Sequence, residues 1–144
     1  QITIHLREDR RHIQDTDVEA VSLVTKKFGK PLNLEMSCDR EMIDMAKTVS
    51  PDWVCLVPEK REEKTTEGGL ALEDKAIFDK IKSTCEEIKQ DLPETRISLF
   101  LQSDPEVLKK AVELQIDAVE IHTGEFARAV LNGDELEPFF QQFR

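Results

Sequence analysis

Residues 31–57 read PLNLEMSCDREMIDMAKTVSPDWVCLV, and this stretch carries a complete strand–helix–strand pattern. Leu32–Met36 and Trp53–Val57 are short runs of mainly apolar residues, as in buried strands. The segment between them predicts a helix that begins near Asp39 and ends at Ser50-Pro51, where the proline disfavours helical geometry in the residue before it. Its apolar positions at helical spacing are Met42, Ile43, Ala46 and Val49. Two strands joined by a helix predict parallel pairing.

The same alternation continues on both sides of this stretch. Three further strands are expected, at Ile2–Leu6, Ile97–Leu101 and Ala118–Ile121. Three further helices are expected: one from a capping box at Thr16–Glu19 to Phe28, one at Leu72–Gln90, and one from Ser103. The first should bury Val18, Val21, Val24 or Thr25, and Phe28; the second should bury Ile77, Phe78, Ile81, Cys85 and Ile88.

Short apolar strands alternating with helices are typical of a parallel sheet covered by helices, either a TIM (β/α)8 barrel or an open doubly wound sheet. The first strand lacks a GxGxxG turn, which favours the barrel. A full barrel of about 250 residues has eight strand–helix units. We therefore expect residues 1–144 to be a single domain that is an incomplete parallel β/α barrel.

Composition limits the partners and the compartment. A formal net charge of −10 argues against a nucleic-acid partner, which is bound by neutralising phosphates. Three cysteines without CxxC spacing fit a reducing, cytoplasmic location, and no stretch approaches the length of a membrane span. The first residues already form a strand pattern, so we expect a chain that begins within the fold.

Charged side chains stand at the ends of the expected strands, where parallel α/β proteins place their sites. Glu35 and Glu120 lie between apolar neighbours, where an unpaired carboxylate is costly, and His5 lies between Ile4 and Leu6. The alternative for each glutamate is a structural ion pair, and the alternative for His5 is a core histidine whose hydrogen bonds are satisfied. The charged run at residues 7–12 could equally be a solvated loop, and the loop at 60–69 could be solvated or bind phosphate.

Several other chemistries find no motif in the chain. There is no GxxxxGK[ST], HExxH, GxSxG or EF-hand pattern, so nucleotide hydrolysis, zinc proteolysis, serine hydrolysis and calcium binding are unsupported. No metal or cofactor is expected. Cys38, Cys55 and Cys85 are interpreted as thiols without a catalytic role.

Six strings in order resemble the pyridoxine 5'-phosphate synthase family: HLREDRRH (5–12), NLEM (33–36), LVPEKR (56–61), TTEGGL (65–70), SLF (98–100) and EIHTG (120–124). The resemblance implies a (β/α)8 barrel of which the chain supplies about strands 2 to 6. It also implies an enzyme of vitamin B6 biosynthesis. The implied reaction condenses 1-deoxy-D-xylulose 5-phosphate with 3-amino-2-oxopropyl phosphate to pyridoxine 5'-phosphate, phosphate and water, without a cofactor.

The resemblance also implies roles for individual residues. His5 matches an acid–base histidine, Glu35 a catalytic carboxylate and Glu120 a carboxylate that stabilises charged intermediates. Three more, Arg7, His12 and Thr65, match residues that hold the deoxyxylulose phosphate. The implied partners are phosphorylated small molecules and further copies of the chain, as an octamer.

The chain departs from the family pattern at both ends. The family's first strand and its later strands are absent, and the Phe-rich tail differs from the usual pattern. Residues 126–144 are therefore interpreted as a lineage-specific insertion. Two alternatives stay open: another phosphosugar barrel, such as an aldolase with Lys60 as the Schiff-base lysine, and a non-catalytic barrel remnant.

Overall fold

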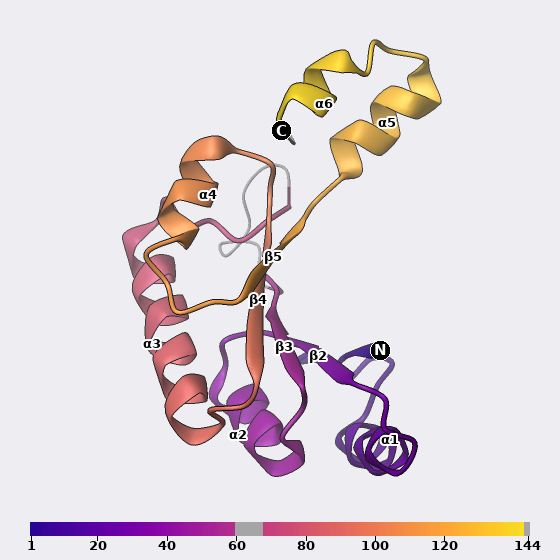
Figure 1. Ribbon diagram of the computed structural model, residues 1–144, viewed down its shortest axis with the longest axis vertical. Coiled ribbons are helices and arrows are strands. Elements are labelled where there is room, and N and C mark those ends of the chain that lie inside the picture. The colour runs from indigo at the N-terminus through magenta and orange to yellow at the C-terminus, as the bar shows by residue number, and fades with distance from the viewer. Residues whose placement is uncertain (60–67, 143–144) are drawn as a thin grey trace.

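The computed structural model describes residues 1–59 and 68–142. Strands and helices alternate along the chain (Figure 1). The strands are β1 (Ile2–His5), β2 (Leu32–Met36), β3 (Trp53–Leu56), β4 (Arg96–Leu101) and β5 (Ala118–Ile121). The helices are α1 (Asp15–Lys27), α2 (Arg40–Val49), α3 (Lys75–Asp91), α4 (Pro105–Ala111), α5 (Gly124–Asn132) and α6 (Glu137–Gln142).

The five strands form one parallel sheet in the order β1-β2-β3-β4-β5, which confirms the expected parallel α/β arrangement. Each strand therefore pairs with the next strand in sequence. The register aligns His5 with Glu35, Glu35 with Cys55, and Cys55 with Ser98. Because alternate residues of a strand point to opposite faces, these four side chains lie on one face of the sheet.

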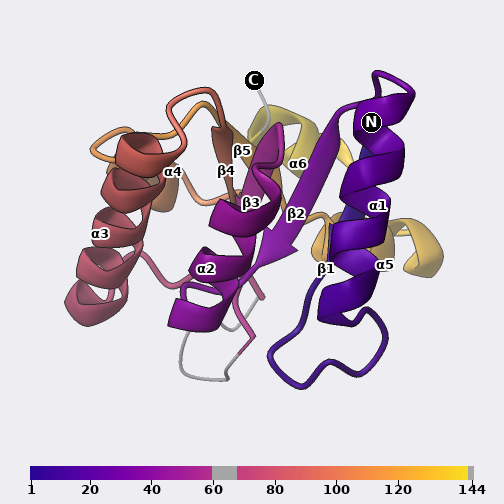
Figure 2. The ribbon, with the colours of Figure 1, turned by 90° about the horizontal axis from the view of Figure 1, so that it is seen from below.

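The opposite face of the sheet carries the hydrophobic core. Helices α1 to α4 follow one side of the curved sheet in succession (Figure 1), and Figure 2 shows α1, α2 and α3 on this same side. Apolar strand residues such as Leu34, Val54 and Leu99 are fully buried there against the helices. Burial of large apolar side chains stabilises a fold by about 1.5–3 kcal/mol each, so this face holds the sheet and helices together.

Helix α2 forms as the sequence predicts. Asp39 is its N-cap residue, and Ser50 ends it in the left-handed region with φ of 46°. The buried residues are Met42, Ile43, Ala46 and Val49, the same four that its apolar spacing indicates. Helix α3 likewise buries Ile81, Cys85 and Ile88 of its expected stripe.

Helix α1 differs from the prediction. Its capping box is formed by Gln14 and Asp17, earlier in the chain than the expected box at Thr16. Its buried residues are Val18, Ser22 and Thr25, whereas Phe28 is 65% exposed and Val24 is 54% exposed. The two hydroxyl groups can be buried because each donates a hydrogen bond to a carbonyl oxygen, Ser22 to Val49 and Thr25 to Ser22.

The last two helices lie apart from α1 to α4, beyond the carboxyl end of β5 (Figure 1). The ring of Phe126 on α5 makes edge contacts with Phe139 and Phe140 on α6, at centroid distances of 5.8 Å. Part of the Phe-rich tail thus packs within the tail itself. Phe143 lies outside the described residues.

Candidate functional site

His5 and Glu35 meet at the carboxyl ends of β1 and β2. They are register partners on these adjacent parallel strands, so their side chains leave the sheet next to each other on the same face. The distance from His5 Nδ1 to Glu35 Oε2 is 3.8 Å. The His5 side chain is 29% exposed and the Glu35 side chain is 30% exposed. The two strands therefore bring together an imidazole and a carboxylate, a pair suited to proton transfer.

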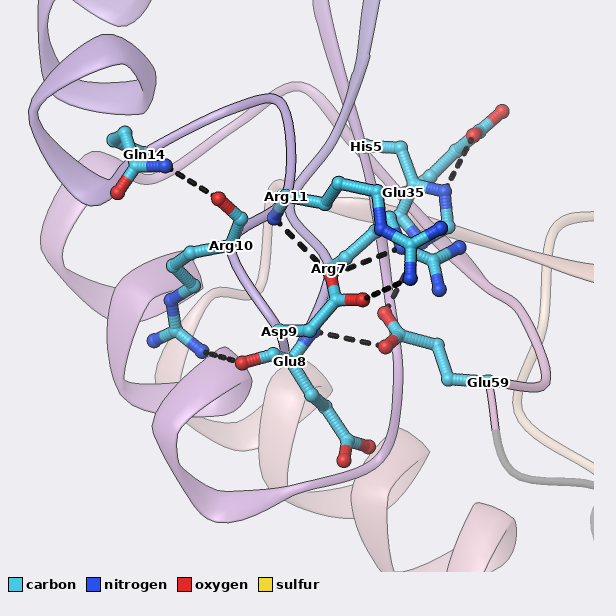
Figure 3. Close-up of polar contacts among 9 residues, drawn as sticks. All are labelled: His5, Arg7, Glu8, Asp9, Arg10, Arg11, Gln14, Glu35 and Glu59. Atoms are coloured by element: carbon cyan, nitrogen blue, oxygen red, sulfur yellow. Dashed lines mark hydrogen bonds and ion pairs between the residues drawn. The ribbon is translucent and has the colours of Figure 1, made fainter.

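A second carboxylate contacts the other nitrogen of the same ring. Glu59 follows β3, and its Oε1 lies 3.1 Å from His5 Nε2. Figure 3 shows His5 with Glu35 and Glu59 at its two ring nitrogens. The side chain of Glu59 is only 6% exposed, much less than that of Glu35. The site is thus a histidine between one accessible and one nearly buried carboxylate.

Glu59 also connects β3 to the loop after β1. Its Oε2 accepts a hydrogen bond of 2.8 Å from the backbone N–H of Glu8. Sequence analysis assigned Glu59 no role. It follows β3 within the LVPEKR string, and the residue before it, Pro58, is buried.

The loop from Arg7 to Gln14 is built from ion pairs (Figure 3). Arg7 donates from Nε to Asp9 at 3.1 Å, and this hydrogen bond raises the pKa of the Arg7 guanidinium and lowers the pKa of Asp9. Arg10 adopts a positive φ of 48° and reaches Asp15 and Glu41. This network holds a loop of arginines paired with carboxylates beside His5 and its two carboxylates.

Glu120 lies on β5, on the same face of the sheet but three strands from Glu35. Ser98 Oγ on β4 donates a hydrogen bond of 2.8 Å to Glu120 Oε1. Between them and Glu35 lies Cys55 on β3, whose side chain is fully buried. Burial raises the pKa of the Cys55 thiol; a hydrogen bond with Ser98 opposes the rise, and the charge of Glu120 adds to it. A polar band therefore crosses the sheet from His5 to Glu120.

The structure brings some of the expected site residues together and leaves others apart. His5, Glu35 and Arg7 lie together at the ends of β1 and β2, and Glu120 lies farther along the same polar face. His12 is exposed on the loop after β1. Thr65 and the candidate lysine Lys60 lie outside the described residues, so the structure does not place them.

His122 is a further polar side chain at the end of β5. Its ring packs edge-on against Phe100, with centroids 5.4 Å apart. A Cβ atom on Gly124 would lie 2.5 Å from the ring, and one on Gly68 would lie 3.5 Å from it. Glycine at position 124 therefore allows the backbone to approach this histidine closely.

Within residues 1–59 and 68–142, no helix has both the length and the apolar composition needed to cross a membrane. The same residues contain no group of three or more His, Cys, Asp or Glu side chains placed to hold a metal ion.

Comparison with known proteins gives a consistent family match. The family described as pyridoxal phosphate biosynthesis protein PdxJ matches residues 1–144. Pyridoxine 5'-phosphate synthase of Aquifex aeolicus (strain VF5) is 47% identical over 127 residues, 88% of this chain and 50% of that protein. The protein of the same name from Syntrophobacter fumaroxidans is 48% identical over 130 residues, 89% of this chain and 51% of that protein. The chain spans about half the length of the curated relatives it matches.

Proposed function

The chain belongs to the family of pyridoxine 5'-phosphate synthases, and from that premise we propose that it forms the His5 half of an active site for pyridoxine 5'-phosphate synthesis. The protein condenses 1-deoxy-D-xylulose 5-phosphate with 3-amino-2-oxopropyl phosphate, releasing phosphate and water. The observation that carries this proposal is the contact between His5 and Glu35, held by strand register at 3.8 Å.

The chemistry of ring closure suits this pair. Joining an amine to a ketone, losing phosphate and forming an aromatic ring each require protons to leave one atom and arrive at another. A histidine and a carboxylate on one face of the sheet can accept and return such protons at neutral pH. His5 and Glu35 are therefore proposed as the acid–base pair.

The remaining site residues have supporting roles in the proposal. Glu120, held by Ser98, stabilises positive charge that develops on the nitrogen-containing intermediate. Arg7 lies beside His5 and supplies positive charge for a phosphate group, and His12 and Thr65 complete the deoxyxylulose phosphate site. This explains how a chain of net charge −10 binds anions: the positive charge is local.

A (β/α)8 barrel is the architecture we propose for the intact protein. In an open doubly wound sheet helices cover both faces, whereas here α1 to α4 follow a single side of the sheet (Figure 1). The other face is polar along four strands, with His5, Glu35, Ser98 and Glu120. A sheet covered by helices on one face, with His5, Glu35 and Glu120 near the carboxyl ends of their strands on the other, fits a barrel wall that further strands would close.

Three further properties belong to this proposal. A cytoplasmic location is supported by the three cysteines, none of which forms a disulfide within the described residues. Self-association as a homo-oligomer is proposed from the family alone, and light scattering on the full-length protein tests it. The tail at 126–144 is proposed as a lineage-specific insertion.

The activity is tested by incubating the full-length protein with both substrates. Mass spectrometry should detect pyridoxine 5'-phosphate, and phosphate should be released in equal amount. Reactions that lack either substrate are the controls. Absence of the product with both substrates present would contradict the proposed function.

A further inference from the structure

We infer that Glu59 is a positioning residue that keeps the proton of neutral His5 on Nε2, so that Nδ1 faces Glu35 as a proton acceptor. The juxtaposition that carries this inference is one nearly buried carboxylate in contact with both a backbone amide and an imidazole nitrogen. The placement of the proton follows from these contacts. Its catalytic consequence rests on the proposed function.

The backbone amide of Glu8 fixes the orientation of Glu59. A backbone N–H can only donate, so Glu59 Oε2 must accept from it, at 2.8 Å. The Glu59 side chain is 6% exposed. With Oε2 held by the amide, Oε1 lies 3.1 Å from His5 Nε2, within hydrogen-bonding distance.

The protonation pattern of the ring follows from that geometry. An ionised carboxylate only accepts hydrogen bonds, so a ring nitrogen that is hydrogen-bonded to it carries the proton. In neutral His5 that nitrogen is Nε2, and Nδ1 is then unprotonated. A carboxylate that holds a histidine in one tautomer is a recurrent device in acid–base sites.

The arrangement leaves two acceptors opposite one another. His5 Nδ1 and Glu35 Oε2 are 3.8 Å apart, too far for a direct hydrogen bond. An ammonium group of a substrate, which has three donors, can donate to both. Glu59 thus gives the His5–Glu35 pair its ability to take a proton from one bound group.

The variant Glu59→Gln reverses this pattern while nearly preserving side-chain size. The Glu8 amide still requires an acceptor, so the oxygen of the introduced side-chain amide turns toward it, and the NH2 group turns toward His5 Nε2. Nε2 must then accept, and the ring proton moves to Nδ1. From there it can donate to Glu35, which removes both acceptors offered to the substrate.

The test is a nitrogen-15 NMR measurement of the His5 tautomer in the full-length protein. Long-range proton–nitrogen correlations are recorded over a pH series that reaches the neutral ring, with His5→Gln to assign the signal. We expect Nε2–H in the wild type and Nδ1–H in Glu59→Gln. A wild-type ring protonated on Nδ1, or the same tautomer in both proteins, would overturn the inference.

Three comparisons separate a positioning role from a structural one. Glu59→Gln should lower kcat about 100-fold or more, the contribution of a general acid–base group. Glu59→Asp keeps the carboxylate and should keep Nε2–H. The control Glu87→Gln removes a carboxylate paired with Arg40 and Lys47 on the helix side, and should leave both the tautomer and kcat unchanged.

The tautomer measurement and the activity assay test the two proposals separately. If the wild type forms no product but Glu59→Gln reverses the tautomer, the proposed function is wrong and the inference about Glu59 stands. If product forms but the tautomer is unchanged by the substitution, only the inference about Glu59 is wrong. The wild-type tautomer needs no variant, so it decides the matter even if Glu59→Gln does not fold.

Discussion

His5 and Glu35 are register partners on adjacent parallel strands, with His5 Nδ1 3.8 Å from Glu35 Oε2. Strand pairing, rather than loop conformation, sets this separation. Sites built on strands hold their geometry more firmly than sites built on loops. The pair is therefore positioned before any substrate binds.

Replacing Glu35 by glutamine should lower turnover by about 100-fold or more, because the amide cannot serve as the general base. The side chain keeps its size, and with 30% of its surface exposed it should not destabilise the sheet. Turnover is measured by formation of pyridoxine 5'-phosphate. Glu106→Gln, at an exposed pair with Lys109 on α4, is the matched control. Near-normal rates for Glu35→Gln would remove this residue from the mechanism.

The sheet and helix α2 could be predicted from the sequence because the apolar patterns that indicate them are local. Four apolar residues at helical spacing between two apolar strands allow only one buried face, and those four are buried. Glu35 could be singled out as a candidate for a similar reason, since a carboxylate between Leu34 and Met36 is unusual in a strand.

The contact of Glu59 with His5 and the buried face of helix α1 could not be predicted from the sequence. The contact of Glu59 with His5 joins residues 54 positions apart, and a charged run gives no local sign of it. In α1, apolar spacing favoured burial of Val24 and Phe28, but hydrogen bonds to carbonyl oxygens let Ser22 and Thr25 take the inner face. Such satisfied hydroxyls depend on the partner element, which sequence periodicity does not describe.

Ser98→Ala should reduce both stability and turnover, because Ser98 supplies a hydrogen bond to Glu120. Ser98 is 1% exposed, so water cannot readily replace the hydroxyl. We expect the free energy of unfolding, measured in urea, to fall by about 1.5–3 kcal/mol, the usual range for a hydrogen bond to a charged group.

Ser83→Ala is the control for this substitution. Its exposed hydroxyl donates only to the carbonyl oxygen of Lys80 within α3, so stability should change little. Loss of stability in Ser98→Ala with unchanged turnover would argue against a role for Glu120 in the reaction.

Asp117 should make the stability of the protein depend on pH. Burial acts to raise the pKa of its carboxyl, but hydrogen bonds from Lys89 and from the Ile97 amide outweigh burial and lower the pKa below its ordinary value of 3.8. A carboxyl whose pKa is lower in the folded state stabilises the fold above its unfolded pKa. That contribution is lost as the pH falls through the folded pKa.

Asp117→Asn should therefore have a lower free energy of unfolding than the wild type at neutral pH. The difference should shrink as the pH falls below about 4, where the unfolded carboxyl takes up a proton. Urea unfolding at several pH values measures it. Asp134→Asn, at an exposed residue of the tail, is the control substitution. A difference that is constant with pH would contradict the role given to Asp117.

The three thiols should react at very different rates. Burial raises the pKa of the Cys55 thiol and raises the pKa of Cys85 to about 12, so neither forms the reactive thiolate near neutral pH. Cys38 is only partly buried. Iodoacetamide at a pH of about 7.5, slightly below the ordinary thiol pKa, followed by peptide mass mapping should label Cys38 first, with Cys55 and Cys85 labelled only after addition of urea. Early labelling of Cys55 would show that the polar face around Glu120 is open to solvent.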